Sequence, residues 1–392
     1  MPMQELYDLS PLARMMLVGV LLALAPLAWV GLRNRHATPG QRLQALTLLT
    51  LLLTFDLVMF GAFTRLTDSG LGCPDWPGCY GKASPFGAGA DIAAAQSAMP
   101  SGPVTHGKAW VEMIHRYLAT SVGVLIMVLA GLGWRRWLGS APNARHQLLN
   151  PWWPTLTLVW VSVQGAFGAL TVTMKLFPAI VTLHLLGGLV LLALLCVQAV
   201  RSAQLDGGLA PLPIGAGLRW LLWLSFALLA VQVALGGWVS TNYAVLACTD
   251  FPMCQNSWWP LMDFRQGFEL WRELGFTRAG EHIDFAALTA IHYLHRVAAV
   301  LVLSLLGVLA WRLNRVAALR SPSRWIAALI SLQLVTGLSN VVLDWPLLAA
   351  VLHTGGAGAL VVVLTWALVA SQTRAPLGAS AVAQRPVPQP PA

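Results

Sequence analysis

The stretch FPAIVTLHLLGGLVLLALLCVQAV, residues 177–200, contains no Asp, Glu, Lys or Arg. A membrane-spanning helix needs about 20 mostly apolar residues, so this stretch is long enough to cross a bilayer. Eight further stretches along the chain meet the same condition. The nine predicted spans are roughly residues 15–32, 43–64, 111–134, 152–172, 177–200, 218–239, 286–311, 325–343 and 347–370.

The composition of the chain agrees with a membrane protein. Its 392 residues are 57% hydrophobic and only 10% charged, which lies outside the range of soluble domains. Lipid cannot satisfy backbone polar groups, and no stretch has the alternating pattern of a barrel strand. We therefore predict an all-α polytopic membrane protein.

Arginines in the connections predict the topology of the chain. They gather in alternate connections, and cytoplasmic loops are the ones enriched in basic residues. These arginines are Arg33, Arg35, Arg42, Arg135, Arg136, Arg145, Arg201, Arg219, Arg312, Arg315, Arg320 and Arg324. Nine spans then place the N-terminus outside and the C-terminus in the cytoplasm, in a cell inner membrane. The net charge of +9 reflects this topology, and a nucleic-acid partner has no support.

The two ends of the chain carry distinct signals. The first span follows Glu5 and Asp8 and precedes basic residues, which is the opposite of a signal peptide's charge order. We interpret it as a retained helix. The chain ends in VAQRPVPQPPA, whose proline-rich polar composition predicts a disordered tail.

Two loops match position by position. Each carries C-x-D-x-P-x-C, beginning at Cys73 and at Cys248. The next span in each half contains a His-Arg pair, and two spans further on a histidine is followed by glycines. The matched pairs are His115–Arg116 with His295–Arg296, and His184 with His353. Equivalent residues of such a parallel repeat lie at the same membrane depth.

We therefore predict two four-helix transmembrane bundles related by internal duplication, plus one extra N-terminal transmembrane helix. The predicted boundaries are residues 1–42 for the extra helix and its basic cytoplasmic loop, 43–200 for the N-terminal half, 201–217 for a cytoplasmic linker, 218–370 for the C-terminal half and 371–392 for the cytoplasmic tail.

Each half places one histidine near the outer end of its second helix and one near the outer end of its fourth. Imidazoles in a membrane are costly and usually face a bundle interior with a partner. One explanation is that they form hydrogen bonds between helices. Because the pair recurs in both halves, we favour two axial ligands on either face of a haem iron. Zinc would require more ligands, and the loop cysteines lie outside the bilayer.

Charged residues beside the histidines suggest further roles. Arg116 and Arg296 stand where haem propionates at the outer edge would find guanidinium partners, or where arginines would reach lipid headgroups. Glu112 lies one turn before His115, whereas the matched position in the other half is His292. A carboxylate in one half only suggests proton chemistry there, with simple solvation as the alternative. Asp56, well inside a span, is either functional or paired within the bundle.

The loop cysteines form two pairs, six residues apart, on the side predicted to be outside. Disulfides fit that compartment, so we expect Cys73–Cys79 and Cys248–Cys254 bridges. Each bridge is either structural or, if exposed, labile enough to exchange electrons. Cys196, within a span, is expected to be a small core residue.

The run GAFTRLTDSGLGCPDWPGCYG from Gly61, followed by EMIHR and the three further histidines, resembles the bacterial haem A synthases that carry cysteine pairs in both halves. The resemblance covers about residues 43–370. That family has eight core helices, so the first span is a departure from it.

The resemblance implies oxidation of the C8 methyl of haem O to the formyl group of haem A, for haem-copper terminal oxidases. It implies a haem b cofactor on His295 and His353, and substrate haem O at His115 and His184, with Glu112 assisting catalysis. It also implies a redox or haem-transfer role for Cys73 and Cys79, with the other pair more structural. Haem O synthase, oxidase assembly factors, lipid and a second copy of the chain are the partners it suggests.

A different class of function is the main alternative. A b-type dihaem protein that carries electrons from quinol would explain the paired histidines and exposed disulfides, but not the asymmetric Glu112. A transporter built from repeats would predict helices broken at mid-membrane, and Pro and Gly do not cluster there.

The topology can be tested by labelling. In intact spheroplasts treated with a reductant, a membrane-impermeant thiol reagent should reach Cys73 and Cys248, because both loops are expected to face the periplasm. Labelling that appears only after lysis would contradict the topology.

Overall fold

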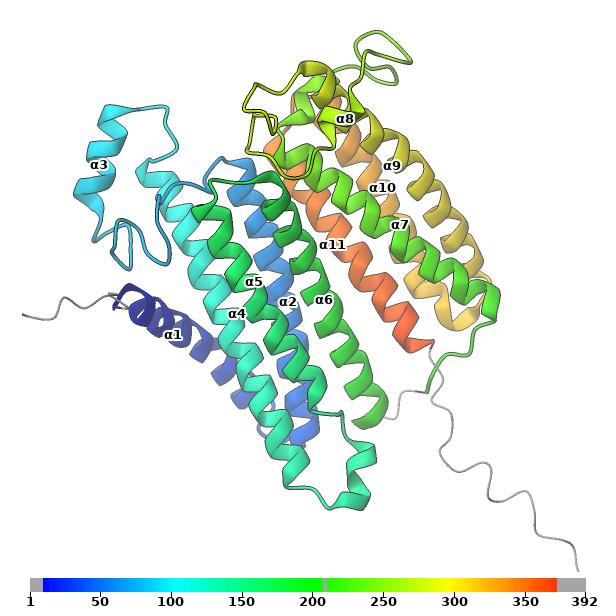
Figure 1. The fold of residues 1–392 in the computed structure, drawn as a ribbon. Coiled ribbons are helices and arrows are strands. Elements are labelled where there is room, and N and C mark those ends of the chain that lie inside the picture. Colours follow the sequence, from blue (N-terminus) through cyan, green and yellow to red (C-terminus); the bar gives the residue numbers. More distant parts are fainter. Residues whose placement is uncertain (1–9, 207–209, 372–392) are drawn as a thin grey trace, which may run out of the picture.

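The long apolar runs determine the architecture. In lipid, a single segment can satisfy its backbone N–H and C=O groups only by forming a helix. The computed structural model describes residues 10–206 and 210–371. Within these residues there is no β-strand, and nine helices are long and apolar enough to cross a membrane (Figure 1). The prediction of an all-α multi-pass membrane protein is therefore confirmed.

The helices follow the predicted spans closely. The nine long ones are α1 (Ser10–Arg33), α2 (Pro39–Leu66), α4 (His106–Leu138), α5 (Trp152–Thr173), α6 (Pro178–Asp206), α7 (Ala216–Thr241), α9 (Phe285–Asn314), α10 (Arg320–Val342) and α11 (Leu347–Ala370). The short ones are α3 (Gly89–Ala98), α8 (Phe264–Gly267) and the 3-10 turns η1 (Pro142–Gln147), η2 (Ala244–Ala247) and η3 (Ala317–Leu319).

Most helices begin or end beyond the predicted limits, because hydropathy marks only the apolar part of a helix. At the start of α2, Thr38 and Gln41 form a capping box, in which each side chain accepts a hydrogen bond from the other's backbone N–H. Helix α6 continues to Asp206, past the predicted boundary at residue 200. The predicted tail, except Ser371, lies outside the described residues, as do Glu5 and Asp8.

The long helices after α1 form two four-helix units with the same order of neighbours. In the first unit α2 contacts α4, α4 contacts α5, α5 contacts α6, and α6 returns to α2. In the second unit α7, α9, α10 and α11 form the same ring. The second and fourth helices of each unit are therefore diagonal partners across its interior. Both cysteine loops, residues 67–88 and 242–263, lie at one end of the molecule, hereafter the cysteine-loop end (Figure 1).

Small residues let the two units approach each other. Helix α6 packs on α7 and α11, and α2 packs on α11. A Cβ atom at Gly237 of α7 would lie 3.2 Å from Leu185 and 3.3 Å from Thr182 of α6. The hydroxyls of Thr182 and Thr241 are hydrogen-bonded at 3.2 Å across the same contact. This is how helices associate in lipid, where packing replaces the hydrophobic effect.

The extra helix α1 lies outside this arrangement. It packs along α4, where the Thr120 side chain occupies the space beside Gly19. Near its first turn, buried Met15 joins the apolar cluster that surrounds Cys73 and Cys79. Helix α1 thus supports the first cysteine loop, and the second loop has no equivalent helix among the described residues.

The contact between the units can be tested at Gly237. Gly237→Val should lower the stability of the protein by about 1–3 kcal/mol, because the added side chain overpacks the α6–α7 contact. The measurement is the thermal unfolding midpoint in a fixed detergent. Gly307→Val is the matched control, because nothing lies within 4 Å of the Cβ position there. Equal shifts for both variants would contradict the packing argument.

Candidate functional site

Each histidine of the first half lies against a glycine of a neighbouring helix. His115 on α4 and His184 on α6 project from diagonal helices, near enough for electrostatic interaction. A Cβ atom at Gly61 of α2 would lie 3.0 Å from His115 Nε2, and one at Gly168 of α5 would lie 3.5 Å from His184 Cε1. The glycines thus leave the room that two flat rings need inside the bundle.

The second half repeats this arrangement. His295 on α9 and His353 on α11 again project from diagonal helices. A Cβ atom at Gly236 of α7 would lie 3.0 Å from His295 Cε1, and one at Gly337 of α10 would lie 3.3 Å from His353 Cε1. The structure therefore brings the predicted histidines together as two matched pairs.

The two pairs differ in how their rings are held. In the second half, Thr336 Oγ1 lies 2.9 Å from His353 Nδ1, and Gln232 Nε2 lies 3.0 Å from His295 Nδ1. In the first half, His184 Nδ1 is buried and has no hydrogen-bond partner among the described residues. Neighbouring side chains therefore orient both imidazole rings of the second pair. In the first pair, the ring of His184 has no such contact at Nδ1.

The hydrogen bond at His353 suits ligation of a metal through the other ring nitrogen. Thr336 Oγ1 already donates to the Leu332 carbonyl, so it can accept from Nδ1–H of His353 and leave Nε2 with its lone pair. Gln232 Nε2 lies 3.0 Å from Nδ1 and 3.2 Å from the backbone carbonyl of His295, so it holds this ring in place without supplying an acceptor for Nδ1–H.

The set of donors fits a haem better than a bare metal ion. Among the described residues, no group of three or more His, Cys, Asp and Glu side chains could hold a metal ion. A haem iron needs only two protein ligands, because the porphyrin supplies four. Two facing imidazoles, each beside a glycine, match that requirement.

Glu112 lies deep in the first half. Its side chain is 4% exposed, so the alternative that it is simply solvated is wrong. Oε1 forms an ion pair with Arg116, and Oε2 accepts a hydrogen bond of 2.8 Å from the backbone N–H of Cys73. The carboxylate therefore connects the helix of His115 directly to the disulfide loop.

The arginines hold the cysteine loops. Arg116 donates to the carbonyls of Asp75, Pro77 and Gly78. In the second half the corresponding guanidinium of Arg296 does the same with three loop carbonyls, which belong to Cys248, Asp250 and Met253. Binding of propionates or headgroups by these arginines stays a prediction, and their donors are already largely used. The clamp was not predicted from the sequence, although the repeated C-x-D-x-P-x-C and His-Arg motifs are its signal.

The loop aspartates complete the clamp. Asp250 accepts hydrogen bonds from the backbone N–H groups of Gln255 and Asn256, and Asp75 binds those of Tyr80 and Gly81 in the same way. The bond from Asn256 is the main reason that the pKa of Asp250 is lowered. The aspartate of each C-x-D-x-P-x-C motif therefore holds its own loop in a closed conformation through hydrogen bonds to the loop backbone.

Both predicted disulfides are formed. The Cα atoms of Cys73 and Cys79 are 4.9 Å apart, and those of Cys248 and Cys254 are 4.8 Å apart. All four cysteines are at most 1% exposed, so a reagent or reaction partner reaches either bridge only when its loop opens. Cys196 is free and buried, as expected of a core residue.

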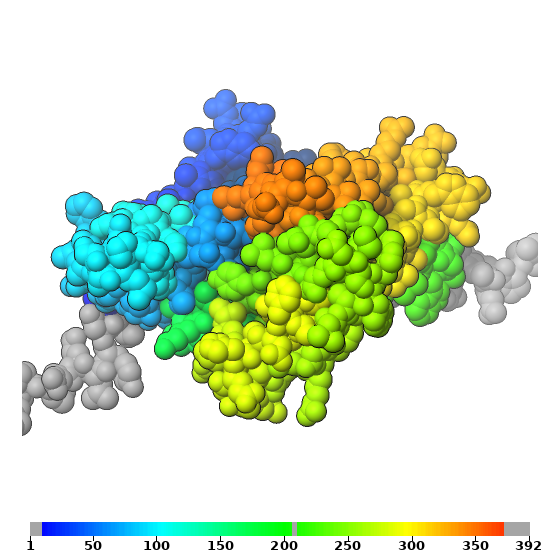
Figure 2. Space-filling view, turned by 90° about the horizontal axis from the view of Figure 1, so that it is seen from above, coloured from blue at the N-terminus to red at the C-terminus, as the bar shows by residue number. Residues whose placement is uncertain are grey.

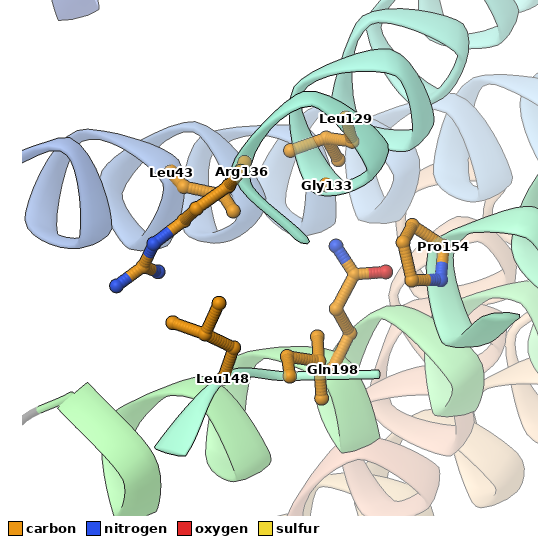
Figure 3. Close-up of a pocket in the computed structure, with 8 residues that line it drawn as sticks. Leu43, Leu129, Gly133, Arg136, Leu148, Pro154 and Gln198 are labelled. Carbon is orange, nitrogen blue, oxygen red and sulfur yellow. The ribbon is translucent and has the colours of Figure 1, made fainter. Parts of the chain in front are cut away.

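Two other features lie away from the histidines. Asp56 is exposed on the face of α2 that carries Leu48 and Leu52, so it does not point into the bundle. At the opposite end of the first half, Figure 3 shows a cavity between Arg136, Gln198 and apolar side chains. Its volume of about 10 Å³ has room for a single water at most, so it is no porphyrin site.

The fold and site together define a class: a polytopic membrane protein with two half-buried histidine pairs, each suited to a haem. The family model described as cytochrome oxidase assembly protein matches residues 44–365. The chain belongs to this family. The match leaves out α1.

Several relatives are similar over most of their length. The heme A synthase of Shewanella oneidensis is 38% identical, over 81% of this chain and 92% of its own length. The heme A synthases of Halalkalibacterium halodurans and Rhodospirillum centenum are each 26% identical and cover 76% and 81% of this chain, and 86% and 84% of their own lengths. The resemblance seen in the motifs is thus confirmed.

The arginine clamp can be tested through the disulfides. Arg116→Gln should speed reduction of Cys73–Cys79 by at least tenfold, because hydrogen bonds to a charged group contribute about 1.5–3 kcal/mol and hold this loop closed. Timed thiol trapping with mass spectrometry measures both bridges in one sample.

The second bridge is the internal control. Arg116→Gln should leave the reduction rate of Cys248–Cys254 unchanged, and Arg296→Gln should give the opposite pattern. The clamp would be ruled out if neither substitution changed the rate of its own bridge.

Proposed function

We propose that this chain is a haem A synthase: an oxidoreductase that converts the C8 methyl of haem O to the formyl group of haem A, for use in haem-copper terminal oxidases. The relatives named above carry this activity in their names. The observation that supports it in this chain is the difference between the two histidine pairs. One pair is held by hydrogen bonds, and the other contains a buried nitrogen without a partner.

In this proposal the second half holds a resident haem b. His295 and His353 would hold it through their imidazoles, and Gln232 and Thr336 fix the orientation of these rings. Side chains that hold the imidazoles in place in this way favour a cofactor that stays bound. When bound, haem b supplies one-electron redox chemistry to the bundle.

The first half takes the substrate. His115 and His184 contact haem O, and Phe60 stacks on His115 with ring planes 10° apart. His184 has no hydrogen bond at Nδ1 that fixes its ring, which suits a molecule that must enter as haem O and leave as haem A. Gly61 and Gly168 give the two imidazole rings the room that they need against α2 and α5.

Glu112 serves as the proton acceptor. Conversion of a methyl to a formyl group takes two successive two-electron oxidations through an alcohol; it needs an external electron acceptor and an oxygen atom from water or dioxygen, and protons must leave the substrate. The buried Glu112 carboxylate lies on the same helix as His115, one turn away, and can take them up. The second oxygen of Glu112 accepts a hydrogen bond from the Cys73 backbone N–H. A movement of the first disulfide loop would therefore change the surroundings of this carboxylate. A redox or haem-transfer role for Cys73 and Cys79 requires that loop to open.

Orientation and partners complete the proposal. The cysteine loops face the periplasm and the arginine-rich connections face the cytoplasm, since disulfides form in oxidising compartments. Haem O synthase and oxidase assembly factors are the expected partners in the membrane. The alternative of a quinol-linked electron carrier relied on exposed disulfides, and both bridges are buried.

The assignment of haem b can be tested directly. His295→Ala and His353→Ala should each remove most of the haem b, because each takes away one of two axial ligands. Pyridine haemochrome spectra of the purified variants measure the content. Wild-type haem b content in both variants would refute this part of the proposal.

The role of Glu112 can be tested with Glu112→Gln, which keeps the shape of the side chain but cannot take up a proton. The variant should retain haem b and accumulate haem O or the alcohol in place of haem A, with turnover reduced roughly a hundredfold or more. Extracted haems are quantified by chromatography and mass spectrometry.

His292→Gln is the matched variant in the other half. It should reduce turnover less, since that half is assigned to holding the cofactor. Full haem A production by Glu112→Gln would exclude the catalytic role of this carboxylate.

A further inference from the structure

A loop of the second half reaches over the first half at the cysteine-loop end. This crossing loop, residues 268–284, is anchored below by Trp238, whose Nε1 donates to the Gly267 carbonyl at 2.9 Å. Its Trp271 packs on Phe177 of the first half, with ring centroids 4.8 Å apart. Figure 2 shows the loop, yellow-green to yellow, beside the green turn between α5 and α6. The two halves thus share a surface that neither forms alone.

This surface contains a pocket of about 550 Å³. That volume lies within the range of small-molecule sites. Phe177 and Trp271 form an aromatic wall, while Arg272 and Arg278 provide cations and Glu273 a carboxylate. The pocket therefore combines a flat apolar side with donors for an anionic group.

Arg272 is the unusual residue of this pocket. It is 3% exposed and donates to Asn242 Oδ1 and to the Phe276 carbonyl. Its Nε has no partner, and no described carboxylate lies within ion-pair distance of its guanidinium. Burial lowers the pKa of Arg272, and the charge of Glu269 offsets this only in part. The guanidinium also lies over the Trp238 ring, 5.8 Å from its centroid, but a buried cation with no carboxylate in contact is costly, so an anionic ligand would reduce this penalty.

The pocket stands above the first histidine pair. Phe177 comes directly before α6 and is seven residues from His184, so it lies on nearly the same side of the helix and about 10 Å closer to the cysteine-loop end. Propionate arms project from one edge of a porphyrin and extend well beyond its iron. Arg116 is used by its own loop, and Arg65 of α2 is used by Asp68 and the Ser240 carbonyl, so the arginines of the crossing loop are left as partners for these arms.

We propose that this pocket binds the carboxylate arms of the substrate haem at the first histidine pair, with Arg272 as the partner of one carboxylate. The inference rests on the proposed function, because it takes haem O as the substrate of that pair. The second half then completes the substrate site of the first. A phospholipid phosphate shares the chemistry of an oxyanion at this depth, and the experiment must separate the two sources.

The test compares two probes that differ only in charge. Ferric protohaem and its dimethyl ester have the same ring and iron, but the ester has no carboxylates. Full-length protein in nanodiscs, with haem b already bound, is titrated with each probe and followed by its Soret band. A His115→Ala variant identifies the signal of the first site.

Arg272→Gln should weaken binding of protohaem by roughly tenfold to a hundredfold, the range for hydrogen bonds to charged groups, and leave the ester unchanged. Arg265→Gln, an exposed arginine of α8 outside the pocket lining, is the matched control and should change neither. Retained haem b reports correct folding. If Arg272→Gln loses haem b, Arg272→Lys decides by the same comparison of probes.

Two results would overturn the proposal. Equal weakening of both probes would assign Arg272 a structural role only. Unchanged binding of both probes, with less phospholipid retained by Arg272→Gln than by wild type, would make the pocket a headgroup site. Failure of the wild type to make haem A would refute the synthase function, but the charge comparison would still stand on its own.

Discussion

An imidazole buried between helices needs space beside it, and four contacts between a histidine and a glycine provide that space in this protein. A residue with a side chain at Gly61 or Gly236 would place its Cβ within 3.0 Å of a ring. Because helices in lipid are held by close packing rather than by the hydrophobic effect, such a contact determines both helix spacing and ring position. The bundles are therefore arranged around their histidines.

The polar groups at the cysteine-loop end extend this control from helix to loop. Arg116 gathers three loop carbonyls, and Glu112 pairs with that arginine while it binds the backbone of Cys73. In the second half His292 takes the place of the carboxylate and accepts a hydrogen bond from Arg296 Nε. The first loop is thus connected to an ionisable acid beside a histidine pair, and the second loop is not.

The sequence alone predicts the spans and the histidine pairs well, for physical reasons. Apolar length is a local property, so helices such as α6 and α11 were recognised directly, and the repeat placed His184 and His353 at one depth. The arginine clamp, the burial of the cysteines and the crossing loop were not predicted. They depend on contacts such as Phe177 with Trp271, which join distant segments without any periodic pattern. The alanine-rich helix α3 was missed because it lies inside a loop.

Helix α1 lies outside the matched family region, yet Met15 packs in the cluster around Cys73 and Cys79. Chains enter the membrane from the N-terminus onward during synthesis, so α1 reaches the membrane before the loop that carries these cysteines. The part of the first disulfide's surroundings that α1 contributes is therefore made first, and the parts from α3 and α4 are made later. The second disulfide has no such early partner. The order of biosynthesis thus gives the two bridges different histories, although their finished loops are closely alike.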